Sequence, residues 1–276
     1  MSTAVALPVT AADGHRFELI SLQPAASPDH HVLWLPALGV AARHYLPLAQ
    51  ALAGRGCQVH LMEWRGHGSS SLRASRTCNW GFAQLLQTDL PAALSALQQH
   101  NASVDTLGGH SLGGQLAACM AADIPGLRHL WLVASGSPHW RRFDAPHRWL
   151  LPLAYTGLPA VAALAGHFPG KQLGFGGREA RGLIFDWARV GRQGQYRIPG
   201  DVQDRMRHYC GHIQAVTLAD DWLAPPSSMQ ALLAKLPTAS AQWHRLDAAM
   251  LGTAANHFSW MRQPEAVAAT LVKMSV

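Results

Sequence analysis

The sequence predicts an α/β protein with a mostly parallel central sheet, helices on both faces and an α-helical cap insertion. The first observation is that short apolar runs alternate along the chain with segments of helical periodicity, which is typical of parallel sheets. The second observation is that this alternation stops after Ser137 and resumes near Ile213. We therefore expect a core domain formed by residues 1–137 and 211–276, and a helical cap or lid formed by residues 138–210.

Four strands and three helices are expected before the insertion. The strands are short apolar runs that precede Gly or Pro, at 32–35, 58–64, 104–107 and 130–133. The helices have apolar residues at helical spacing, at 45–52, 79–100 and 112–122. Asn79 can cap the second helix, and Pro91 is expected to kink or split it.

The insertion is rich in Trp, Arg, Gly and Pro, and Leu183 to Val190 has helical spacing. Trp149 to Gly170 contains no Lys, Arg, Asp or Glu, so its 22 residues could span a bilayer. Pro152 and Pro159 interrupt this stretch, which favours a buried or partner-covering helix pair, with an interfacial contact as a minority interpretation. Beyond the insertion we expect strands at 213–218 and 242–246, a helix at 229–236 and a last helix from Pro264.

Composition excludes several classes of protein. Of the 276 residues 49% are apolar and 14% are charged, which is incompatible with a disordered chain. The net charge of +6 is carried by Arg residues spread along the chain, so no nucleic-acid partner is expected. The scattered Cys57, Cys78, Cys119 and Cys210 suit reduced thiols, and no signal peptide is evident. These features predict a cytoplasmic protein.

The pattern that carries chemistry is Gly109-His110-Ser111-Leu112-Gly113, which fits G-x-S-x-G. It lies between a predicted strand and a predicted helix, as a nucleophile elbow requires. A nucleophile on such a tight turn has a strained backbone, and side chains two residues away would collide with it. This placement favours a nucleophilic Ser111 over an ordinary strand-to-helix loop.

Taken in order, several further motifs resemble those of the α/β-hydrolase fold superfamily over essentially the whole chain. Pro36-Ala37-Leu38-Gly39 stands where that family often has His-Gly-x-Gly, and residues 63–69 resemble its Asp-x-Arg-Gly-x-Gly-x-Ser turn. Asp221-Trp222-Leu223-Ala224-Pro225 resembles its acid loop, and Asn256-His257-Phe258 its late His loop. The chain is thus identified as similar to serine hydrolases of the esterase type with a cap.

The resemblance implies a role for each residue. Ser111 is the expected nucleophile, His257 the general base and acid, and Asp221 the group that orients His257. Asp220 stays open as an alternative acid, although the distance to Pro225 favours Asp221. The backbone N–H groups of Leu38 and Leu112 are the expected oxyanion donors. Arg65 is expected to brace its loop rather than bind substrate.

We expect hydrolysis of a carboxylic ester with an apolar acyl or alcohol part, so the expected partner is a small ester or acyl molecule. Acyl transfer by the same triad and a catalytically silent binding protein are the alternatives. No cofactor is expected, because no nucleotide-binding Gly motif is present. His208, Cys210 and His212 have no third ligand at matching spacing, so no metal is expected. Membrane-surface contact is disfavoured, and the sequence leaves the oligomeric state open.

Overall fold

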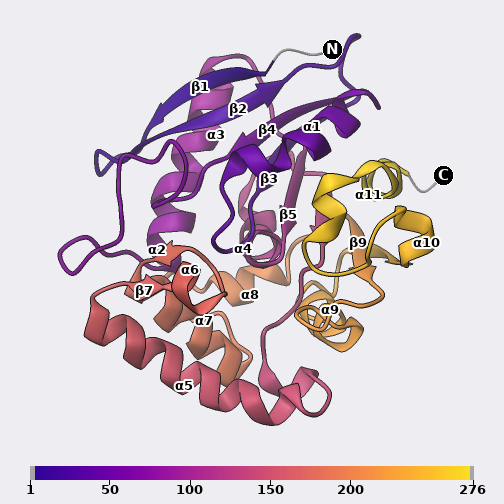
Figure 1. Cartoon of the computed structure of the whole chain (residues 1–276). Coiled ribbons are helices and arrows are strands. Elements are labelled where there is room, and N and C mark those ends of the chain that lie inside the picture. The colour runs from indigo at the N-terminus through magenta and orange to yellow at the C-terminus, as the bar shows by residue number, and fades with distance from the viewer. Residues whose placement is uncertain (1–3, 274–276) are drawn as a thin grey trace.

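The computed structural model describes residues 4–273 and contains an eight-stranded sheet of order β1-β2-β4-β3-β5-β6-β9-β10 (Figure 1). The six strands from β4 to β10 in this order are parallel, whereas β1 and β2 pair antiparallel at one edge. The predicted α/β class with a mostly parallel sheet is therefore confirmed. The strands are β1 (Val5–Thr10), β2 (Arg16–Leu22), β3 (His30–Leu35), β4 (Cys57–Met62), β5 (Thr106–His110), β6 (His129–Val133), β9 (His212–Leu218) and β10 (Ser240–Leu246).

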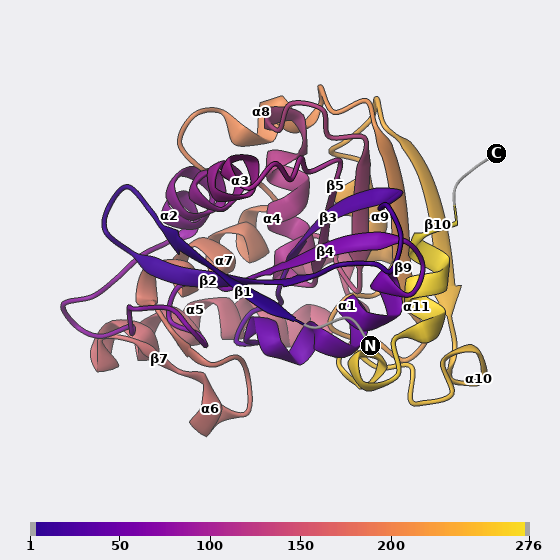
Figure 2. The same cartoon turned by 90° about the horizontal axis from the view of Figure 1, so that it is seen from above.

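Helices cover both faces of the sheet (Figure 2). On one face α1 (Leu46–Ala53) and α11 (Glu265–Leu271) share an apolar cluster with Trp34 and Trp131. On the other face α3 (Leu90–Gln99), α4 (Leu112–Met120) and α9 (Pro226–Leu233) pack in a second, larger cluster. The central strands are buried on both sides, which explains their nearly continuous apolar sequences.

The N-terminal hairpin of β1 and β2 was not among the expected elements. Its strands are half exposed, and Pro8 lies inside β1, where a proline argues against a central strand. An edge strand tolerates proline because one row of its N–H groups has no partner strand. The hairpin therefore lacks the continuous apolar signal by which the inner strands were found.

Strand β5 extends past the predicted end at Leu107 and includes Gly108 and Gly109. The sequence predicts that these two glycines end the strand. In the fold a Cβ on Gly108 would overlap the ring of Trp34, and one on Gly109 would overlap the backbone of Gly113. The glycines thus let the neighbouring strand and α4 pack closely against β5 without ending it.

The helix predicted at 79–100 begins instead with α2 (Phe82–Gln84), and Asn79 does not cap it. The Asn79 side-chain oxygen accepts a hydrogen bond from the Gly182 N–H at 2.9 Å and so binds another helix. A π-helical turn, Leu85–Asp89, lies between α2 and α3 and interrupts the α-helix predicted at 79–100. Pro91 then lies in the first turn of α3, where its missing N–H would have no partner anyway.

The uncharged stretch that begins at Trp149 forms most of one helix, α5 (His147–Ala165). The expected pair of helices, buried or partner-covering, is therefore wrong in that a single helix is present. Pro159 cannot donate to the carbonyl of Tyr155, and the Arg192 guanidinium donates to that carbonyl instead. This substitute bond allows the helix to continue through a proline. Within residues 4–273, no helix combines the length and apolar character needed to cross a bilayer.

Residues 138–210, including α5, are called the cap segment below. After α5 the cap segment forms α6 (Gly170–Leu173), α7 (Arg181–Gln193), α8 (Val202–Met206) and the short strands β7 (Phe168–Pro169) and β8 (Arg178–Glu179). Figure 1 shows α5, α6 and α7 gathered below the sheet. Several side chains of α7 and α8, including Leu183 and Val202, belong to the same apolar cluster as α3 and α4. The division into a core and a separate cap therefore stays a prediction.

Candidate active site

A cavity of about 390 Å³ lies where β3, β5 and β6 end, between the sheet and the cap segment. Ser111, Leu112, Leu38 and His257 all line it, so four of the five predicted site residues meet at one place. The remaining lining residues are mostly apolar and include Phe143, Leu151, Ala154, Tyr155, Leu158, Phe175, Trp187, Trp222 and Phe258. Ligands of open α/β sheets bind at this edge, beyond the carboxyl ends of the strands.

Ser111 occupies the turn between β5 and α4 in a backbone conformation that non-glycine residues rarely adopt, with φ 53° and ψ −119°. Its N–H donates to the carbonyl of Val133 at 3.0 Å, which holds the turn on the neighbouring strand. A Cβ on Gly113 would overlap the carbonyl of Leu35, so the glycine admits α4 to the sheet at close range. Such strain costs about 1–3 kcal/mol and lifts the Ser111 side chain out of the sheet.

His257 and Asp221 contact each other, although 36 residues separate them. Nδ1 of His257 lies 2.8 Å from Oδ2 of Asp221, and both side chains are buried. The second carboxylate oxygen of Asp221 accepts the N–H groups of Leu223 and Ala224, at 2.9 and 3.2 Å. Because an ionised carboxylate only accepts, this contact places a proton on Nδ1 and leaves Nε2 free to accept one.

Asp220, the alternative acid, lies on the exposed side of the same loop. Its N–H donates to the carbonyl of Ala255 at 3.0 Å and ties the acid loop to the histidine loop. The loop around His257 is fixed further, since the Asn256 side chain accepts two N–H groups and the indole N–H of Trp260 donates to the His257 carbonyl. Of the two aspartates, Asp221 is therefore the one that His257 contacts.

The loop after β3 carries Leu38 and is held from two sides. The Tyr45 hydroxyl accepts the N–H of Ala37 at 2.9 Å and lies 2.8 Å from Nδ1 of His110, the residue before Ser111. On the opposite side Gly39, at φ 78°, approaches Gly177 of the cap segment so closely that a Cβ would overlap it. The Leu38 loop is thus fixed relative to Ser111 by a hydroxyl and by a glycine contact.

His110 lies near the site without a triad role, as its place in the Ser111 motif suggests, whereas no sequence motif points to Tyr45. Burial lowers the pKa of His110 well below its usual range, and the adjacent His257 adds to the effect. His110 is therefore neutral, and its ring packs 4.8 Å from that of His257, measured between centroids. The chain separation of 65 residues between Tyr45 and His110 leaves no local pattern that could reveal their contact.

Polar groups that face the cavity are free of protein partners. Among residues 4–273, neither Ser111 Oγ nor His257 Nε2 has a hydrogen-bond partner, and the Leu38 N–H donates to no protein group. The N–H of Leu112 is in the first turn of α4, where an N–H has no acceptor within its own helix. A serine hydroxyl, an imidazole nitrogen and two backbone N–H groups are thus available to a ligand.

Ion pairs of Arg65 and His67 brace the loop that follows β4. Arg65 donates two hydrogen bonds of 2.7 Å to the fully buried Asp89, so it braces the loop as expected. His67 lies 3.2 Å from Glu179 of the cap segment, whose other oxygen accepts the Gly177 N–H. Burial alone would lower the pKa of His67, but the hydrogen bond and charge of Glu179 outweigh it and raise that pKa.

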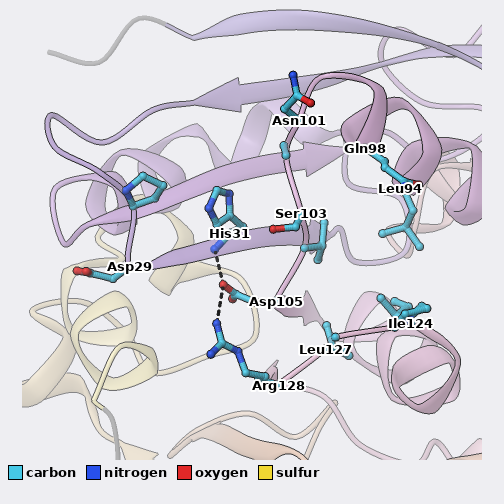
Figure 3. Close-up of a pocket in the computed structure, with 15 residues that line it drawn as sticks. Asp29, His31, Leu94, Gln98, Asn101, Ser103, Asp105, Ile124, Leu127 and Arg128 are labelled. Carbon is cyan, nitrogen blue, oxygen red and sulfur yellow. Dashed lines mark hydrogen bonds and ion pairs between the residues drawn. The ribbon is translucent and has the colours of Figure 1, made fainter.

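A larger hollow, of about 1120 Å³, lies at the amino-terminal ends of β3, β5 and β6, away from Ser111 (Figure 3). Its main charged group, Asp105, accepts the backbone N–H of His31 and faces Arg128 at 3.7 Å. The hollow is open to solvent. Besides these contacts, the Asp105 carboxylate accepts a hydrogen bond from the Thr106 hydroxyl and lies 3.6 Å from His30 Nδ1. Ser103 and His31 both line the hollow, but among residues 4–273 no hydrogen bond joins them, so the cavity at Ser111 is the candidate active site.

Metal binding finds no support in the described part of the chain. Among residues 4–273, no group of three or more His, Cys, Asp or Glu side chains is arranged to hold a metal ion.

Comparison with known proteins identifies the family of this chain. The family model of serine aminopeptidase, S33, a hydrolase family, matches residues 26–169. No match was found among curated protein sequences.

Solved structures with the same fold include a hydrolase from Pseudomonas aeruginosa PA01. Its sequence is 17% identical, its TM-score is 0.65, and the match covers 98% of this chain and 97% of that hydrolase. The esterase domain of a Rhodothermus marinus protein is 15% identical, with a TM-score of 0.63 over 98% and 96%. The enol-lactonase of Burkholderia xenovorans LB400 is 18% identical, with a TM-score of 0.61 over 96% and 98%. At such identities these structures establish the fold, and with the family match over half of the chain they show that this protein belongs to the serine aminopeptidase, S33, family of α/β-hydrolase enzymes.

Proposed function

We propose that the protein hydrolyses a carboxylic ester that has an apolar acyl or alcohol part, with Ser111 as nucleophile. The observation that carries the proposal is the convergence of Ser111 and the Asp221-bound His257 on one apolar cavity. A serine hydroxyl is a weak nucleophile by itself and needs a base oriented by a third group. The Asp221 contact supplies that orientation, because it leaves the Nε2 of His257 unprotonated.

The reaction proceeds through an acyl-enzyme. Ser111 Oγ attacks the ester carbonyl while His257 Nε2 takes its proton, and the Leu38 and Leu112 N–H groups stabilise the oxyanion. The C–O bond then breaks, and the leaving alcohol takes the proton from His257. A water molecule repeats these steps on the acyl-enzyme and releases the acid. The Ser111–His257 hydrogen bond forms in the substrate complex, since such bonds are often long before substrate binds.

The cavity itself selects for an apolar ester. At about 390 Å³ it suits a small molecule, and most of its lining is aliphatic or aromatic. Its polar side chains include Ser111, His257, Gln115 and Tyr155, besides the indole N–H groups of Trp187 and Trp222. The Gln115 oxygen and the Tyr155 hydroxyl already bond within the protein. An apolar chain gains free energy from this lining, whereas a charged group would lose hydration without finding a partner.

The same lining argues against peptide substrates with a free amino terminus. No Asp or Glu lines the cavity, and Asp221 is buried behind His257. A protonated amine placed there would have no carboxylate to pair with, which is costly at low dielectric. An uncharged ester is therefore the better substrate for this pocket.

A screen of p-nitrophenyl esters with increasing acyl length, with Ser111→Ala as the control, tests the proposal. We expect turnover that rises from acetate to chains of intermediate length, and loss of at least about 10³-fold in the variant. A peptide p-nitroanilide with a free amino terminus is the comparison substrate. The proposal fails if all esters are inert, if Ser111→Ala retains its activity, or if the anilide is the better substrate.

A further inference from the structure

The outer face of α5 is apolar and exposed to solvent. Trp149, Leu150, Leu153, Val161 and Leu164 have exposed fractions of 65, 55, 70, 37 and 78%. Leu150 lies three residues before Leu153, and the other four recur at spacings of three, four or eight residues, so all five lie on one side of the helix. Soluble proteins rarely leave so many large apolar side chains of one helix in water without a partner.

The inner face of the same helix belongs to the candidate site. Leu151, Ala154, Tyr155 and Leu158 line the cavity at Ser111. A single helix therefore separates the cavity from the exposed apolar face.

The apolar face is continuous with the mouth of the cavity. His147, the first residue of α5, stacks on Trp222 with ring centroids 4.2 Å apart. Trp222 and Phe258 both line the cavity and are 49 and 47% exposed. Apolar surface thus runs from α5 to the cavity that holds Ser111.

The charge around this face is one-sided. Residues 138–181 contain six Lys and Arg residues but only two acids. One of these acids, Glu179, is buried against His67, which leaves Asp144 as the exposed one. Arg148 lies over the rings of Trp140 and Trp149, and Arg141 over that of Trp140, so cations flank the apolar face at the start of the helix.

We propose that α5 docks the protein on an anionic lipid surface. Its apolar side chains would enter the acyl boundary, and Arg141, Arg142 and Arg148 would face the lipid phosphates, as in interfacial helices with basic flanks. A second copy of the chain fits less well, because it would bring the same cations to an interface that offers only Asp144. The docking goes beyond ester hydrolysis and requires no turnover.

Co-sedimentation with vesicles tests the proposal. One set contains equimolar phosphatidylcholine and phosphatidylglycerol, and the other contains phosphatidylcholine alone. We expect the wild-type protein to bind the anionic vesicles and to be released as salt rises. The double variant Leu153→Asp with Leu164→Asp should bind the anionic vesicles at least about tenfold more weakly than the wild type. Neither residue lines the cavity.

The control carries the same change of charge at a distance from α5. Val5 and Met250 are 59 and 60% exposed, so Val5→Asp with Met250→Asp should leave most of the binding intact. Circular dichroism verifies that both double variants fold. The proposal is overturned if wild type binds no vesicle at low salt, or if the two double variants bind equally. It is also overturned if light scattering shows a dimer that only the α5 variant dissociates.

Discussion

His257 Nδ1 lies 2.8 Å from Asp221 Oδ2, while the adjacent Asp220 is exposed and bonds only through its backbone to Ala255. Two neighbouring carboxylates therefore differ completely in their relation to the candidate base. This difference gives a matched pair of variants on one loop.

Asp221→Asn should lower kcat on an active ester by about 10³–10⁴-fold, because the amide no longer fixes the Nδ1-protonated form of His257. Asp220→Asn should stay close to wild type, since its side chain touches no part of the site. Steady-state kinetics on the best p-nitrophenyl ester compares them. Equal losses in both variants would mean that Asp221 does not orient the base.

Removal of the Tyr45 hydroxyl is expected to lower the rate of catalysis as well as stability. Tyr45→Phe leaves the buried N–H of Ala37 without an acceptor, at a cost of about 1–3 kcal/mol in the free energy of unfolding. We expect kcat to fall about tenfold, since the loop that carries Leu38 loses its tether and a full oxyanion donor is worth about 3 kcal/mol. KM should change little, because Tyr45 does not line the cavity.

Tyr209→Phe is the control for that variant, since the Tyr209 hydroxyl makes only a 3.4 Å contact with the His212 carbonyl, away from Ser111. Urea unfolding and initial rates measure stability and kcat for both variants. An unchanged kcat in Tyr45→Phe, together with the expected loss of stability, would show that Tyr45 has a purely structural role.

Arg65 and Asp89 predict a large effect on stability. Arg65→Met leaves the fully buried Asp89 carboxylate without its bidentate partner, which should cost about 3–5 kcal/mol. Arg55→Met is the control, because the exposed Arg55 only donates to the Ala51 carbonyl, and it should change stability by less than about 0.5 kcal/mol. Chemical unfolding distinguishes the two, and a small effect of Arg65→Met would contradict this account of the loop.

His60 predicts how stability depends on pH. Burial, helped by the charge of His31, lowers the pKa of His60 to about 4 from an ordinary value of 6.5. Between these values the unfolded chain binds the proton and the native protein does not, so stability falls as pH drops below about 6.5. The loss from His60 alone should approach about 3 kcal/mol near pH 4.

His60→Gln keeps an amide that can bond to Ser21 but removes the titration. The difference in unfolding free energy between pH 7 and pH 4.5 should therefore shrink by about 2–3 kcal/mol in this variant. His44→Gln, at an exposed position, should show the wild-type difference. Equal pH dependence of the wild type and His60→Gln would contradict the assignment.

Many strands of the sheet and the main residues of the candidate site could be predicted, because each of them leaves a local pattern in the sequence. Apolar runs reveal strands that are buried on both faces, and Ser111, Asp221 and His257 each lie in a short motif. The edge strands β1 and β2 were missed because exposure and Pro8 weaken that signal. The bond between Tyr45 and His110 was missed because it depends on two segments that meet only in the fold.

The cap segment shows a different limit of sequence patterns. Pro152 and Pro159 suggested two helices, but a proline breaks a helix only if the carbonyl that it frees finds no other donor. Arg192, from α7, supplies that donor to Tyr155 and cannot be foreseen from the sequence of α5. Apolar composition also suggested burial, whereas Leu153 and Leu164 face solvent.

Labelling with a fluorophosphonate, followed by intact-protein and peptide mass spectrometry, tests the central claim most directly. The account predicts one covalent adduct, located on Ser111, that is absent in Ser111→Ala and strongly slowed in His257→Ala. An unlabelled wild-type protein, or equal labelling of Ser111→Ala, would contradict the claim that Ser111 is the nucleophile.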